Sequence, residues 1–271
     1  PLTLLGPNDG KNGYAGDRVA EAIIQYPSGI TSGDHSLVFI DSDDVTISGF
    51  TFNDNLTTSL TYDATWPLPL SANGIQSWGS NTTVEYNKFS GFNDIAVHMT
   101  QDGASSQPHV AATTGNTTRY NLFEDGAVYS NIYYQAAGGT ISQNHIVDGM
   151  GIQVQTYRTD ASGQVSDNQI SAYTSGIWYN YANGSQIGVS DWTFSYNDMM
   201  APTATPDWSK LVWDGASRPF AGIRVETYIE TANTYEPVAN FENNTIDGDG
   251  AATPDYSAVR GMFFRNVNGD A

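Results

Sequence analysis

A short motif with a central Asn recurs along most of this 271-residue chain. It follows the pattern apolar-x-x-Asn-x-apolar, and its copies are centred on Asn87, Asn121, Asn144, Asn168, Asn197 and Asn244. These residues lie 34, 23, 24, 29 and 47 positions apart, so a bare repeat is near 23 residues and the longer ones carry inserted loops. A repeat of this length is typical of a solenoid, in which each repeat buries its apolar side chains only against its neighbours.

The segments around each Asn alternate apolar and polar residues, which predicts short strands. A further segment often opens with Gly, as in Gly151-Ile152 and Gly176-Ile177. Asn tolerates left-handed backbone, so it suits a tight bend between two strands. Because stacked strands lie about 4.8 Å apart, Asn side chains at successive bends can form a hydrogen-bonded ladder. The chain is therefore predicted to be an all-β solenoid.

The repeat resembles the right-handed parallel β-helix family, which includes pectate lyases and many large secreted or surface proteins of bacteria. The resemblance covers nearly the whole chain, and residues 2–8, 21–24 and 45–52 look like the first coils of such domains. It implies one right-handed parallel β-helix domain over residues 1–271. The implied domain would have about eight coils of three short strands, with Asn at the turn between the second and third strands. The fold hosts enzymes, stalks and adhesins alike, so it implies no single activity.

The chain is strongly acidic, with 10 Lys and Arg against 29 Asp and Glu and a formal charge of −19. Such a surface repels nucleic acid and anionic lipid and favours cations, Ca²⁺ in particular. The absence of Cys excludes thiol catalysis and Cys-ligated zinc, and no apolar run is long enough for direct membrane insertion. The first residue is Pro and both ends fall inside a coil. We therefore expect a piece of a larger extracellular or cell-surface protein that contacts neighbouring domains of its parent chain.

In the family's terms, the Gly-led segments are the first strands of the coils. We expect eight of them, at Leu37–Ile40, Gly74–Ser77, Ile95–His98, within Val128–Tyr133, and at Ile152–Gln155, Ile177–Asn180, Ile223–Glu226 and Met262–Arg265. Inserted loops flank this face on both sides, at residues 53–73, 100–116, 181–190, 200–221, 227–238 and 247–257. Two such walls over a flat sheet predict a groove, and the resemblance implies that polysaccharide lies in it.

Alternation on these strands predicts which side chains leave the core. Ile152, Val154, Ile177, Ile223 and Val225 should point inward, and the outward set should be Gln153, Gln155, Trp178, Asn180, Arg224 and Glu226. We place His98 in the column of Gln155, Asn180 and Glu226, and Tyr157 and Tyr228 at the groove's edge. Aromatic faces stack on sugar rings and planar polar groups bind hydroxyls, so this set predicts a glycan site. Two interpretations remain for the Trp residues of the inserted loops. They either extend that site or only anchor their loops to the body of the solenoid, and they are Trp66, Trp208 and Trp213.

Two kinds of function stay open on this reasoning. One is a non-catalytic module, which would serve as a stalk, an adhesin segment or a carbohydrate-binding platform. The other is a polysaccharide lyase or glycoside hydrolase that uses Glu226 with Arg224 beside it. Hydrolysis usually needs two carboxylates about 5 to 9.5 Å apart. The sequence offers Asp102, Asp148 and Asp214 as partners for Glu226 and does not fix one.

Three aspartates are candidate ligands for a Ca²⁺ ion. Asp125 and Asp148 each lie four residues after their Asn, and Asp247 lies one position earlier in its own coil. Carboxylates stacked on adjacent coils repel one another unless a cation lies between them. The competing interpretation is ordinary turn chemistry, in which Asp bonds nearby backbone N–H groups.

Overall fold

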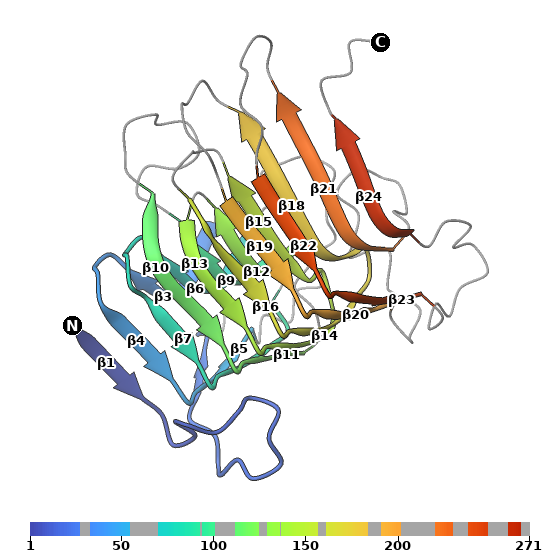
Figure 1. Cartoon of the computed structure of the whole chain (residues 1–271). Coiled ribbons are helices and arrows are strands. Elements are labelled where there is room, and N and C mark those ends of the chain that lie inside the picture. The colour runs from blue at the N-terminus through green and yellow to red at the C-terminus, as the bar shows by residue number, and fades with distance from the viewer. Residues whose placement is uncertain are drawn as a thin grey trace.

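The computed structural model describes residues 1–27, 33–54, 70–92, 94–100, 112–124, 129–135, 137–156, 161–183, 191–201, 220–229, 238–248 and 260–266. These residues form 24 strands, β1 to β24, and within them there is no helix. Three parallel sheets of eight strands run along the molecule, and each takes every third strand of the chain (Figure 1). The fold is thus the predicted right-handed parallel β-helix, with eight coils of three strands.

Sheet A holds the strands that precede the recurring Asn. Its strands are β1 (Leu2–Leu5), β4 (Val45–Ser48), β7 (Thr83–Glu85), β10 (Thr113–Arg119), β13 (Ala137–Ser142), β16 (Gly163–Ser166), β19 (Asp191–Ser195) and β22 (Val238–Glu242). Sheet B holds the strands that follow it. Its strands are β2 (Ile23–Gln25), β5 (Thr51–Asn53), β8 (Lys88–Ser90), β11 (Leu122–Glu124), β14 (His145–Gly149), β17 (Gln169–Ala172), β20 (Asp198–Met200) and β23 (Thr245–Asp247).

Sheet C holds the strands expected to be the first of each coil. They are β3 (Gly33–Ile40), β6 (Leu70–Ser77), β9 (Ile95–Met99), β12 (Ser130–Gln135), β15 (Ile152–Thr156), β18 (Ser175–Asn183), β21 (Ala221–Ile229) and β24 (Arg260–Asn266). Seven of them contain the predicted segment and β12 overlaps it, so this part of the prediction is confirmed.

The core is a stack of apolar side chains that runs the length of the solenoid. Ile152, Val154, Ile177 and Ile223 are buried in it, as alternation predicted. On the first strand, Leu2 is 55% exposed, whereas its pairing partner Val45 on the next strand is buried.

The corner between sheets A and B is a continuous hydrogen-bonded ladder of Asn side chains. The backbone N–H and Nδ2 of Asn121 donate to Oδ1 of Asn144 at 3.1 and 3.0 Å. Asn144 donates in the same way to Asn168, and its Nδ2 also reaches the carbonyl oxygen of Thr118 at 2.9 Å. The pattern extends from Asn87 to Asn244, which confirms the predicted ladder.

The ladder Asn is nevertheless not the residue that bends the backbone, and that part of the prediction was wrong. Left-handed backbone, with φ between 54° and 57°, occurs at the residue before each ladder Asn, namely Tyr86, Tyr120, Gln143, Asp167, Tyr196 and Asn243. Left-handed backbone is unfavourable for residues other than Gly. The ladder hydrogen bonds offset this cost, so Asn is required at the corner for its amide and not for its backbone.

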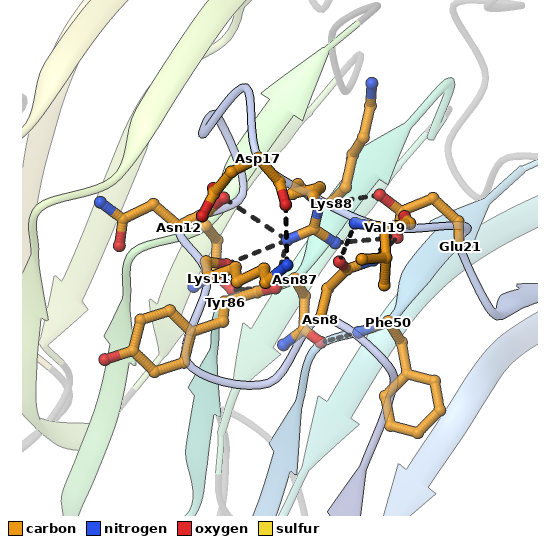
Figure 2. A network of polar contacts seen from close by, with 12 residues as sticks. Asn8, Lys11, Asn12, Asp17, Val19, Glu21, Phe50, Tyr86, Asn87 and Lys88 are labelled. Atoms are coloured by element: carbon orange, nitrogen blue, oxygen red, sulfur yellow. Dashed lines mark hydrogen bonds and ion pairs between the residues drawn. The ribbon is translucent and has the colours of Figure 1, made fainter.

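Residues 6–22, between β1 and β2, fold back over this corner as a strap (Figure 2). Within the strap, Oδ1 of Asn8 accepts a hydrogen bond from the backbone N–H of Val19 at 2.7 Å. Arg18 holds both carboxylate oxygens of Glu21, at 2.7 and 2.9 Å, and its Nη1 donates to the carbonyl oxygen of Tyr86 at 2.8 Å. The strap thereby ties the first coil to a later bend of the corner.

Candidate ligand site on the outer face of sheet C

The side chains predicted to point outward form two columns on sheet C. In the first column, Gln153 pairs with Trp178 on the next strand, and Trp178 pairs with Arg224. In the second, Gln155 pairs with Asn180 and Asn180 with Glu226. The register thus brings these six residues of β15, β18 and β21 together, as the alternation predicted.

His98 lies in the first column, so the prediction that placed it in the second was wrong. It pairs with Tyr133 of β12, which in turn pairs with Gln153. The two columns are two residues apart along each strand and share a face. Alternation reports only the face, and a shift of two residues leaves it unchanged.

The columns also contain residues that sequence reasoning missed. Tyr133 stacks on the His98 ring with centroids 5.0 Å apart and planes 4° from parallel. Gln135 extends the second column, where it pairs with Gln155, and Phe263 follows Arg224 in the first. The polar and aromatic pattern of β12 resembled that of its neighbours, but its register could not be placed from the sequence.

All these predicted side chains are buried, which differs from the open groove that we expected. The exposed fractions of Gln153, Gln155, Trp178, Asn180, Arg224, Glu226 and His98 lie between 1% and 9%. Strands in a sheet are about 4.8 Å apart, so each side chain shields the flanks of the next one in its column. The inserted segments expected to wall a groove lie mainly outside the described residues.

Several polar atoms on this face have no hydrogen-bond partner among the described residues. They include both amide atoms of Gln153, Oδ1 of Asn180 and Nδ1 of His98. More than about 90% of buried polar groups in proteins are paired, and leaving one unpaired costs about 1–3 kcal/mol. A concentration of such atoms on one face is typical of a site that a ligand completes.

Arg224 is enclosed by its neighbours. Its guanidinium carbon lies 6.0 Å from the ring centre of Trp178 and 5.2 Å from that of Phe263. Its Nη1 lies 3.4 Å from Oε1 of Glu226, so the two opposite charges face one another at a buried position. Both distances lie within the range over which a cation and an aromatic ring attract each other.

His98 is uncharged at neutral pH. Burial lowers its pKa from the ordinary value of 6.5 to about 4, and the hydrogen bond with Gln135 only partly opposes this. Nε2 lies 3.2 Å from Oε1 of Gln135. An amide oxygen can only accept, so the proton is assigned to Nε2 and Nδ1 carries a lone pair.

Less is known of the remaining residues that were predicted to bind a glycan or a metal ion. Tyr157 and Asp125 lie outside the described residues, as do Trp66, Trp208 and Trp213. Tyr228 lies on β21 and Asp148 on β14, but their side chains are not described. Asp247 is exposed on β23, where its backbone oxygen accepts from Ala201. Among the described residues, no three or more His, Cys, Asp or Glu side chains come together so that they could hold a metal ion, and the calcium site stays a prediction.

Comparisons with family models, with characterised proteins and with solved structures find no match to this chain. In the part of the chain that the structure describes, no helix is long and apolar enough to cross a membrane.

Proposed function

We propose that this chain is a β-helix module of a secreted or cell-surface protein, and that it binds a glycan on the outer face of sheet C. The observation that carries the proposal is the set of buried, unpartnered polar atoms on Gln153, Asn180 and His98. A module that served only as a stalk would gain stability from apolar or paired residues at these positions. Their retention favours a ligand that supplies the missing hydrogen bonds.

The chemistry of the face suits a sugar. An amide such as that of Gln153 can donate to one hydroxyl oxygen and accept from another hydroxyl group. The rings of Tyr133 and Trp178 belong to the same column and are the aromatic groups of this face that the C–H groups of a pyranose would contact. The strongly acidic composition argues against nucleic acid or an anionic membrane as the partner.

A substitution on this face, with a control on another face, tests the proposal. In a binding assay on a panel of oligosaccharides, Gln153→Leu should weaken the affinity for any bound glycan at least tenfold. Gln164→Leu changes an exposed Gln of sheet A and should leave that affinity unchanged. Failure of the wild type to bind any member of the panel would contradict the proposal, as would equal affinities for all three proteins.

A catalytic alternative rests on Glu226, a carboxylate that is almost fully buried beside Arg224. Hydrolysis would need a second carboxylate. Of the candidates, Asp102 and Asp214 lie outside the described residues, and the side chain of Asp148 on β14 is not described. If the wild type releases reducing ends or unsaturated uronates from a polysaccharide, Glu226→Gln should abolish that release. Binding without any such release would leave the module non-catalytic.

A further inference from the structure

We propose that the strap of residues 6–22 couples the first five coils of the solenoid, so that they unfold as one cooperative unit. The first coil comprises β1, β2 and β3, and each later coil takes the next three strands. In an ordinary solenoid each repeat contacts only its neighbours, so a terminal repeat opens without disturbing distant ones. The strap leaves the first coil after β1, returns to it at β2, and contacts coils as far away as the fifth.

The contacts of the strap begin at the second coil. The backbone N–H of Asn8 donates to the carbonyl oxygen of Gly49 at 3.3 Å, and Asp9 accepts a hydrogen bond from the hydroxyl group of Ser48. Gly49 has left-handed backbone, with a φ of 78°, and a Cβ atom there would clash with the backbone nitrogen of Asp9. The strap therefore packs directly on the corner of the second coil.

The middle of the strap contacts the third and fourth coils at their left-handed residues. Nη1 of Arg18 donates to the carbonyl oxygen of Tyr86 at 2.8 Å. The backbone N–H of Gly13 donates to the carbonyl oxygen of Tyr120, also at 2.8 Å. A Cβ atom at Gly13 would clash with the carbonyl oxygen of Asn87 in the ladder. Gly13 therefore allows the strap to approach the corner more closely than any residue with a side chain would.

The strap reaches the fifth coil through Tyr14. The rings of Tyr14 and His145, which lies on β14, are 5.5 Å apart between centroids and nearly perpendicular, at 77°. A turn on either side of Tyr14 is closed by the hydrogen bond from the backbone N–H of Ala15 to the carbonyl oxygen of Asn12 at 2.9 Å. The first coil is thus tied to each of the next four coils, and its separation from the solenoid would break contacts with all of them.

The coupled coils carry part of the candidate site on sheet C. His98, Tyr133 and Gln153 lie on β9, β12 and β15, which belong to the third, fourth and fifth coils. The unpartnered atoms of His98 and Gln153 lower the stability of these coils. The strap contacts the same three coils at the corner between sheets A and B and opposes their opening, while the side chains of sheet C keep their unpartnered atoms.

Two alanine substitutions in the strap test the coupling. Gly13→Ala should push the strap away from the corner, whereas a Cβ atom at Gly16 meets no other atom within 4 Å, so Gly16→Ala is the matched control. Native-state hydrogen exchange is measured for the hydrogen-bonded amides of β1 and β2. In Gly13→Ala their exchange should be about tenfold faster or more, as expected for the loss of one or two hydrogen bonds. Exchange should be unchanged in Gly16→Ala, and also in β19 of the seventh coil in either variant.

Tyr14→Ala is a milder second variant, which stays informative if Gly13→Ala does not fold. It removes the contact with the fifth coil and should also accelerate exchange in β1 and β2, by a smaller factor. If neither variant accelerates this exchange relative to Gly16→Ala, the strap is a passive surface segment and the proposal is wrong. It is equally wrong if these amides in the wild type exchange much faster than those of β8 and β11, because coils that unfold together share one opening free energy.

Discussion

The corner of Asn residues and the outer face of sheet C both bury rows of polar side chains, but they treat those side chains in opposite ways. At the corner, Asn144 is buried with its amide oxygen and nitrogen both engaged by the coils on either side. On sheet C, Gln153 is equally buried, yet neither of its amide atoms has a hydrogen-bond partner among the described residues.

This difference distinguishes the residues that stabilise the fold from the residues that are expected to bind a ligand. A buried amide with all its bonds made adds stability and specifies the register of the coils. A buried amide with none lowers stability by about 1–3 kcal/mol per group, so its presence needs another reason. The corner therefore accounts for how the chain folds, and sheet C is where a ligand is expected.

The largest expected loss of stability comes from a substitution in the Asn ladder. Asn144→Ala removes two bonds that Nδ2 donates and two that Oδ1 accepts, at about 1 kcal/mol each, so the free energy of unfolding should fall by about 4 kcal/mol. Urea denaturation measures this loss. Asn240→Ala alters an exposed Asn of β22 and should change little. A loss of less than about 1 kcal/mol for Asn144→Ala would show that the ladder is not a main source of stability.

Acid should affect sheet C through His98. Its folded pKa of about 4 lies below the ordinary 6.5, so the unfolded chain takes up the proton first and stability falls between pH 6.5 and 4. The full loss is about 3 kcal/mol. Subtracting the pH profile of His98→Gln from that of the wild type isolates this contribution from the many carboxylates. Parallel profiles would mean that His98 is accessible to protons in the folded state.

Gln153→Leu should change stability in the opposite direction to Asn144→Ala. It replaces an unpartnered buried amide by an apolar side chain of similar size, so the free energy of unfolding should rise by about 1–2 kcal/mol. The same denaturation experiment measures it, and Asn168→Leu, within the ladder, should be destabilising. If Gln153→Leu proves as destabilising as Asn168→Leu, the two regions do not differ in the way described.

The smallest expected effect concerns the strap. Arg18→Lys removes the bidentate contact with Glu21 and the hydrogen bond to the carbonyl oxygen of Tyr86. The free energy of unfolding should fall by about 1 kcal/mol. Arg119→Lys, at a more exposed ion pair with Glu85, should cost almost nothing in thermal denaturation. Equal effects would indicate that the strap adds no more stability than an ordinary surface ion pair.

Most of the fold could be predicted from the sequence because it follows from the local periodicity of apolar residues and of Asn. The alternation around Ile152 and Ile177 showed which residues enter the core, and the recurring Asn marked one corner of every coil. The register of β12 could not be predicted, since a shift of two residues keeps the same faces, and His98 was misplaced for that reason. The strap over the corner was not foreseen because its bonds join residues such as Arg18 and Tyr86, 68 positions apart.

The sequence by itself determined the architecture of this protein, a parallel β-helix with an Asn at one corner and polar and aromatic residues on sheet C. Those features depend on the period of side chains along a strand, which any stretch of sequence displays. Only the tertiary structure decided that Tyr86 and its equivalents, and not the Asn residues, carry the left-handed backbone. It also decided that Gln153 and Asn180 are buried with unpartnered atoms. Burial and hydrogen bonding depend on neighbours from other coils, and distance along the chain does not reveal them.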